Sequence, residues 1–178
     1  NKAKLNDDIY VTGNLGDSFI GLQILRNKIK VSKKVKKYFL SKYYKPDIQI
    51  NLPNKLIQFA NTSIDISDGL IADLEKMINK QKLSYILSEE SIPISNYLLK
   101  LIKNKKLNKS QLISNGDDYQ VLFTADPSNQ RIILNTSKKL GIKITQIGKI
   151  NSFKKQSGII GRKNKQILIK NKGFKHQF

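Results

Sequence analysis

Hydrophobic residues follow two periods along this chain, and together they predict a mixture of strands and helices. Short β-branched or alternating runs predict strands at 8–13, 63–66, 83–87, 120–124 and 143–150, and a hairpin over 159–169. Apolar residues three or four apart predict helices at 19–26, 31–44, 70–80, 96–103 and 127–140, and a further helix that begins near Pro53 and includes 56–60. Because the two kinds of segment mix without strict alternation, the sequence predicts an α+β domain with a mixed β-sheet.

The segment 63–70 places polar side chains where a strand turns into a helix. Ile64 and Ile66 point to one face of the predicted strand, and Asp65 and Ser67 to the other. Ser67 or Asp68 is expected to cap the following helix. Two carboxylates at such a turn can hold Mg²⁺, and the hydroxyl and helix N–H groups can face a phosphate. From spacing alone, the favoured interpretation of this segment is an ordinary capped turn without a ligand.

Two other turns have comparable chemistry. In the segment 115–119, Asp117 and Asp118 come directly before a predicted strand. The pattern favours a simple turn whose Asp side chains bond the local main chain, and the alternative is a turn that places a carboxylate at a ligand. The turn with Gly13 and Gly16 precedes a helix for which Asp17 or Ser18 is the expected cap. It could bind an anion, although close packing of the strand on the helix better explains its glycines.

Size and composition narrow the class of protein. The chain has 178 residues, 39% of them hydrophobic, which suits one domain or at most two small ones. No apolar run is long enough to cross a membrane, and the start without methionine or signal region suggests a piece of something longer. The lack of cysteine excludes disulfides and thiolate metal sites and fits a cytoplasmic protein. A single histidine excludes multi-histidine metal sites.

The net charge of +20 raises the possibility of a nucleic-acid partner. The basic residues are 30 lysines, spread along the whole chain, and only three arginines, Arg26, Arg131 and Arg162. Arginine is the residue that reads phosphates and bases through a planar fork. A composition bias that fills solvent-facing positions with lysine therefore explains the charge better, and nucleic acid is an unlikely partner.

The ordered series of motifs resembles the C-terminal part of thiamine-monophosphate kinase. The landmarks are Ile9-Tyr10-Val11-Thr12-Gly13 with Gly16-Asp17-Ser18 and Gly21-Leu22, Ile64-Asp65-Ile66-Ser67-Asp68-Gly69-Leu70 with Asp73-Leu74, Gly116-Asp117-Asp118-Tyr119, Phe123-Thr124, Ile147-Gly148-Lys149-Ile150 and Gly173-Phe174. They cover nearly the whole chain in the family's order, and the Asp-x-Ser-Asp-Gly-Leu segment is the most specific of them.

The resemblance implies an ATP- and Mg²⁺-dependent phosphorylation of thiamine monophosphate to thiamine diphosphate. It implies a three-layer α/β/α domain of the aminoimidazole ribonucleotide synthetase superfamily. Residues 1–178 would be one C-terminal domain, inactive alone. The family's N-terminal domain, which carries most metal- and ATP-binding acids and forms the homodimer, would come in cis or as a separate chain. Alternatives are another ATP-dependent enzyme of the superfamily, a degenerate remnant, or a basic nucleic-acid-binding module.

The resemblance also implies roles for individual residues. By motif, Asp65 and Asp68 would bind Mg²⁺, and Ser67 would contact ATP. Asp117 and Phe174 would contact the substrate, and no residue of this chain is assigned as catalytic. Asp117 stands where the family usually has glutamate, and Phe174 where it has tryptophan or tyrosine, so both contacts would differ in detail from those of the family.

Overall fold

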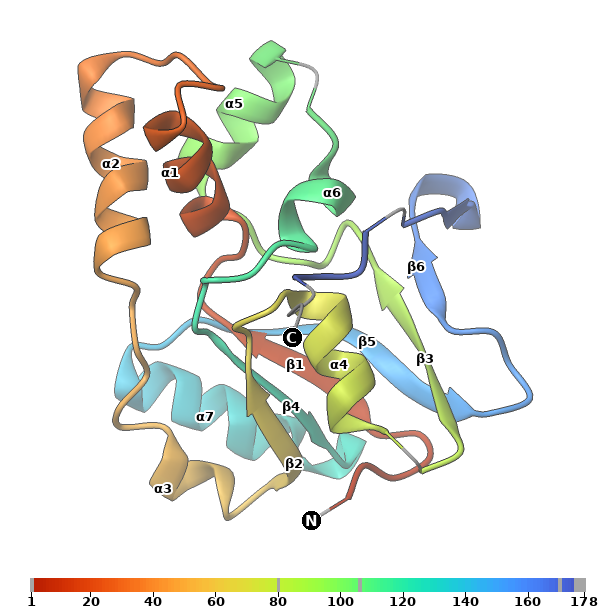
Figure 1. Ribbon diagram of the computed structural model, residues 1–178. Coiled ribbons are helices and arrows are strands. Elements are labelled where there is room, and N and C mark those ends of the chain that lie inside the picture. Colours follow the sequence, from red (N-terminus) through yellow and green to blue (C-terminus); the bar gives the residue numbers. More distant parts are fainter. Residues whose placement is uncertain (1, 80, 106, 170, 175–178) are drawn as a thin grey trace, which may run out of the picture.

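A single mixed sheet organises the described part of the chain in this computed structural model, which describes residues 2–79, 81–105, 107–169 and 171–174 (Figure 1). The strand order is β2-β4-β1-β5-β3-β6-β7, and the β3–β6 pair is parallel while the other described pairs are antiparallel. The strands are β1 Asp8–Thr12, β2 Ala60–Asp65, β3 Leu83–Ser88, β4 Val121–Ala125, β5 Ile144–Ser152, β6 Gly158–Ile160 and β7 Gln166–Ile167. The predicted mixed sheet and the hairpin at its end, β6–β7, are confirmed.

Helices cover both faces of the sheet, so the predicted three-layer α/β/α arrangement is confirmed. Helix α4 lies on one face and α3 and α7 on the other, while α1, α2, α5 and α6 form a separate lobe beyond the sheet (Figure 1). The helices are α1 Asp17–Leu25, α2 Lys33–Tyr44, α3 Pro53–Leu56, α4 Leu70–Met77, α5 Asn96–Lys105, α6 Lys109–Ile113 and α7 Gln130–Leu140, with short 3-10 turns at Pro127–Asn129 and Arg162–Asn164. None of the described helices combines the length and apolar character needed to cross a bilayer.

The alternation of side chains along the strands divides the core into two layers. In β1, Ile9 and Val11 join the cluster beneath α4, while Tyr10 between them packs with the cluster beneath α3 and α7. The Tyr10 ring stacks on Phe123 with centroids 5.2 Å apart. A third cluster, with Phe39 fully buried, holds the helical lobe together. Burying one such phenylalanine stabilises the fold by about 2–3 kcal/mol.

Several local predictions differ from the structure. Neither predicted cap of α1 is used: Gly16 is the N-cap with φ 86°, and Asp17 lies in the first turn. Neither Ser67 nor Asp68 caps α4, because the chain turns at Gly69 with φ 128° and no side chain bonds as a cap there. The helix predicted from near Pro53 to Ala60 is α3, which begins at Pro53 as expected but ends at Leu56, and Ala60 already belongs to β2. Helix α4 ends at Met77, and its expected end at Lys80 lies outside the described residues.

Candidate functional site

Two polar turns that are distant in sequence are joined through their main chains. The N–H of Asp117 donates to the carbonyl of Ser67 (3.0 Å), and the N–H of Tyr119 to the carbonyl of Ile66 (2.9 Å). The N–H of Ile66 donates in turn to the carbonyl of Gln120 (2.8 Å). These bonds continue the β2–β4 pairing beyond the strands, because β2 and β4 are adjacent and antiparallel. The predicted Ser67 and Asp117 are thereby held beside each other.

Glycines permit this close approach of one turn to the other. A Cβ on Gly116 would lie 1.8 Å from the carbonyl oxygen of Ser67. A Cβ on Gly69 would lie 2.4 Å from the carbonyl oxygen of Ser114, and its φ of +128° is one that other residues rarely adopt. Both obstacles are main-chain atoms, which cannot rotate away. Glycine at these two positions is therefore a requirement of the packing.

Asp73 organises the turn, a role that the sequence prediction missed. One oxygen of its buried carboxylate accepts the N–H groups of Ser67, Asp68 and Gly69 at 3.0, 2.9 and 3.0 Å. Its other oxygen pairs with the ammonium of Lys76 at 2.8 Å, and Lys76 also pairs with Asp68. A carboxylate oxygen that accepts several N–H groups fixes a loop tightly. An acid in the first turn of the helix was the available signal.

The segment 171–174 packs against the start of α4. The N–H of Ala72 donates to the carbonyl of Lys172 (2.9 Å), and the N–H of Phe174 donates to the carbonyl of Asp68 (2.8 Å). Gly173 leaves no room for a side chain, since its Cβ would lie 2.4 Å from the Cβ of Ala72. These contacts bring Phe174 to the same turn as Asp68. Residues 175–178, the rest of the expected aromatic tail, lie outside the described residues.

These elements enclose a cleft of about 850 Å³ between the helical lobe and the α4 turn. Four of the five predicted site residues line it: Ser67, Asp68, Asp117 and Phe174. The exposed Asp65, at the end of β2, is not among the residues that line it. The remaining lining residues are Phe19, Leu22, Arg26, Tyr43, Asn115, Gly116, Tyr119, Asn171 and Gly173. The cleft therefore combines carboxylates, aromatic rings and one guanidinium group.

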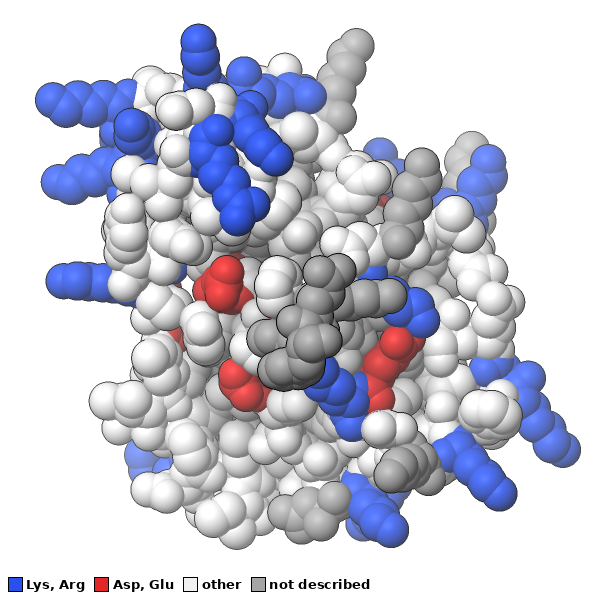
Figure 2. Space-filling view, viewed as in Figure 1, with Lys and Arg blue, Asp and Glu red and all other residues white. Residues whose placement is uncertain are grey.

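The two acids of the cleft influence each other electrostatically. Burial raises the pKa of Asp117, and the nearby negative charge of Asp68 raises it further. Asp117 also has a positive φ of 68°, a conformation held by its main-chain bond to Ser67. A bound cation would relieve the repulsion between the two carboxylates. In Figure 2 acidic side chains gather near the middle of this face, where some basic side chains lie beside them, while other lysines and arginines lie at its periphery.

A divalent cation would find only part of its ligand set on this chain. Across the described ranges, no group of three or more His, Asp or Glu side chains is placed to hold a metal ion. Mg²⁺ needs near-octahedral oxygen ligands and commonly takes several from phosphates and water. Two carboxylates on the cleft fit that chemistry, provided that the other ligands come from a bound phosphate or another domain. The metal roles of Asp65 and Asp68 stay predictions.

Asp118 serves the scaffold and does not line this cleft. Its fully buried carboxyl accepts the N–H of Gly16 at 2.7 Å and the N–H of Ser18 at 3.5 Å. Burial raises the pKa of Asp118 to about 8. The first N–H groups of α1 are thus satisfied by a side chain of the protein, which supports the packing interpretation of the Gly13–Gly16 turn.

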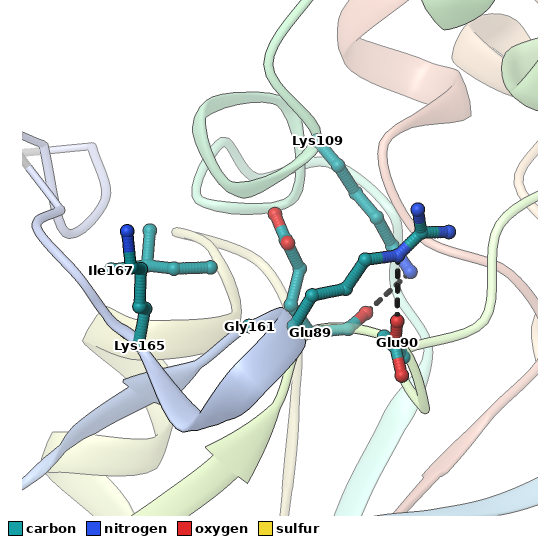
Figure 3. A pocket seen from close by; sticks show the side chains of 7 residues that line it. Glu89, Glu90, Lys109, Gly161, Lys165 and Ile167 are labelled. Carbon is teal, nitrogen blue, oxygen red and sulfur yellow. Dashed lines mark hydrogen bonds and ion pairs between the residues drawn. The ribbon is translucent and has the colours of Figure 1, made fainter.

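A second hollow, of about 550 Å³, lies between the β6–β7 turn and the start of α6 (Figure 3). Two of its charged side chains pair with each other, since Arg162 bonds Glu90 at 3.0 Å, while Lys109 bonds the main-chain oxygen of Glu89 at 2.5 Å. Ser110 donates to the Glu89 carboxylate at 2.5 Å. No predicted site residue lines it. The first cleft is therefore the candidate site.

Comparison with known proteins identifies the class of fold first. The structure of thiamine monophosphate kinase (ThiL) from Aquifex aeolicus is 26% identical, with a TM-score of 0.73 over 93% of this chain and 52% of that chain. AaThiL complexed with AMPPCP and TMP has a TM-score of 0.78 over 99% of this chain and 53% of that chain, again at 26% identity. Escherichia coli HypE shares the fold alone, at 14% identity and a TM-score of 0.67 over 94% of this chain and 50% of that chain. The α/β/α domain is thus of a class that occurs in both kinds of protein.

Sequence comparison shows which of these two kinds of protein the chain resembles more. The thiamine-monophosphate kinase of Buchnera aphidicola subsp. Schizaphis graminum is 38% identical over 98% of this chain and 54% of that protein. The thiamine-monophosphate kinase of Escherichia coli K12 is 32% identical over 84% of this chain and 46% of that protein. No family model matches the sequence. The chain is a homologue of thiamine-monophosphate kinase, and it spans about half the length of the curated relatives it matches.

Proposed function

We propose that residues 1–178 form the C-terminal domain of an enzyme that uses ATP and Mg²⁺ to convert thiamine monophosphate to thiamine diphosphate. Homology with thiamine-monophosphate kinases over nearly the whole chain supports this. The similar structure that holds AMPPCP and TMP supports both the nucleotide and the acceptor. The proposed enzyme is cytoplasmic and is completed by an N-terminal domain, in cis or as a separate chain, within a homodimer.

The observation that carries the proposal is the chemistry of the cleft. Thiamine monophosphate is a flat, cationic aromatic molecule with a phosphate group. Phe19, Tyr43 and Phe174 offer aromatic faces for its rings, and Asp68 and Asp117 offer negative charge. Transfer of a phosphoryl group to a phosphate depends on positioning and charge neutralisation more than on a protein nucleophile. The charged and aromatic residues that line the cleft suit that requirement.

Within this proposal the predicted residues share the binding of metal, nucleotide and substrate. Asp65 and Asp68 contribute carboxylate oxygens to Mg²⁺, and Ser67 contacts ATP from the rigid turn that Asp73 holds. Asp117 and Phe174, which both line the cleft, hold the thiamine part. When bound, Mg²⁺ neutralises the charge of two phosphates that must approach each other. The main-chain bonds between the turns keep these groups in register during binding.

The test is reconstitution of the complete enzyme. The chain is combined with the N-terminal half of its Buchnera relative, and thiamine diphosphate is measured after addition of ATP, Mg²⁺ and thiamine monophosphate. We expect Mg²⁺-dependent product, reduced at least about tenfold by Asp65→Asn or Asp68→Asn. The matched control is Asp126→Asn, an exposed acid outside the cleft, which should leave turnover unchanged. A well-folded assembly that forms no product would overturn the proposal.

A further inference from the structure

Arg26 is the one basic residue among the described residues that line the cleft. It follows the last residue of α1, where its N–H donates to the carbonyl of Leu22 at 3.0 Å and fixes the main chain. Its side chain is exposed and has no hydrogen bond or ion pair with another described residue. The main chain thus places Arg26 on the cleft, and the donors of its guanidinium group are available to a ligand.

It is informative that this residue on the cleft is an arginine and not a lysine. Of 33 basic residues only three are arginines, so the bias that fills the surface with lysine does not account for an arginine on the cleft. The other two are elsewhere: Arg162 is paired with Glu90 at the second hollow, and Arg131 lies on α7, which covers the face of the sheet opposite α4. A planar guanidinium can bind a phosphate through two parallel hydrogen bonds, which an ammonium cannot do.

The rest of the cleft determines which part of a ligand lies near Arg26. Asp117 repels a phosphate unless a cation lies between, while the charge of Asp68 is partly offset by its ion pair with Lys76. Phe19 on α1 and Tyr43 on α2 line the cleft with Arg26 and come from the same lobe, so their rings are available to stack on an aromatic ring of a ligand. A ligand with an aromatic cation at one end and a phosphate at the other is therefore complementary to a wall that has both rings and a guanidinium group.

We infer that Arg26 binds the phosphate group of thiamine monophosphate and makes the cleft prefer the phosphorylated ligand to thiamine itself. This inference rests on the proposed function, which it deepens by assigning a specificity-determining residue. Arg26 contributes little to binding of the rings, so its effect is confined to the phosphorylated ligand.

The experiment is a titration of the ¹⁵N-labelled chain with thiamine monophosphate and, separately, with thiamine, followed by NMR at constant ionic strength. The quantity compared is the ratio of the two dissociation constants. We expect the unmodified chain to bind thiamine monophosphate about tenfold more tightly, and R26Q to reduce the ratio to near one without changing the thiamine constant. R26K should give an intermediate ratio, because lysine keeps the positive charge but lacks the planar guanidinium group that donates two parallel hydrogen bonds.

The matched control is K28Q, which removes one positive charge from an exposed residue two positions away that does not line the cleft. The inference is overturned if R26Q keeps the preference, if K28Q removes it equally, or if the unmodified chain shows no preference or no binding. The NMR spectrum itself shows whether each variant is folded. Turnover of the reconstituted enzyme is a separate readout: loss of turnover with the Arg26-dependent preference intact would overturn the proposed function alone.

Discussion

Replacement of Gly116 by alanine gives the most direct test of how the site is built. Alanine can adopt the main-chain conformation of Gly116, which has no positive φ. Its methyl group, however, would lie 1.8 Å from the carbonyl oxygen and 2.6 Å from the carbonyl carbon of Ser67. To restore ordinary contact, the two turns must separate by about 1.5 Å. The change therefore probes the packing of one turn on the other.

The expected cost follows from the bonds that this separation breaks. The N–H groups of Asp117 and Tyr119 now donate across the junction at 3.0 and 2.9 Å, and both bonds would be lost. Each such bond contributes about 1 kcal/mol, and overpacking a tight site costs about 1–3 kcal/mol more. The free energy of unfolding should fall by about 4 kcal/mol. For a chain of this size, that lowers Tm by about 10 °C.

The assay is urea and thermal unfolding followed by circular dichroism, with Gly141→Ala as the matched control. Gly141 has φ +64°, but a Cβ there meets nothing within 4 Å, so the control carries only the left-handed strain of about 1 kcal/mol. Gly116→Ala should also weaken binding of thiamine monophosphate, because Asp117 moves with the turn. A loss of stability no greater than that of the control would refute the packing argument.

Three further predictions concern single side chains. Asp73→Ala leaves three N–H groups without their acceptor, and we expect the free energy of unfolding in urea to fall by about 3 kcal/mol, with a clearly smaller loss for the exposed Asp126→Ala. Because burial raises the pKa of Asp118 to about 8 from an unfolded value near 4, folding favours its protonated form. Stability should therefore decline from about pH 4 to pH 8, and Asp118→Asn should flatten this slope in urea midpoints measured across that range; an unchanged slope would contradict the assignment. Phe174→Ala should weaken binding of thiamine monophosphate about fivefold in the NMR titration through loss of ring stacking, whereas Phe153→Ala, equally exposed but outside the cleft, should not.

The strands were the most predictable part of the fold. β1 and β4 are short runs of β-branched and aromatic residues, and the left-handed Gly141 (φ 64°) ends α7 as expected. The five-residue α6 was missed, because so short a helix has too few turns to show a period. The sheet order was also beyond prediction, since it places β4 between β1 and β2 through contacts far apart in sequence.

The site was predictable as motifs but not as geometry. The sequence identified Ser67, Asp68, Asp117 and Phe174, and the structure places all four on one cleft. It could not show that Asp73 would hold the turn, because polar residues in a helix N-terminus look alike until their partners are known. The sequence could not show that Arg26 lies on the cleft either, since the position of Arg26 depends on how the helical lobe packs against the sheet. The chemical roles of these residues stay predictions.

The junction of the two turns has a consequence for how such proteins diverge. Its bonds run between main-chain atoms and depend on glycine, and the side chain of Ser67 takes no part in them. Asp117 has a φ of 68°, so exchanges at that position are limited to residues that tolerate a positive φ. Exchanging a displayed side chain within that limit alters what is recognised without breaking the main-chain bonds beneath it. Selection can explore new ligands at low structural risk, while the glycines remain fixed.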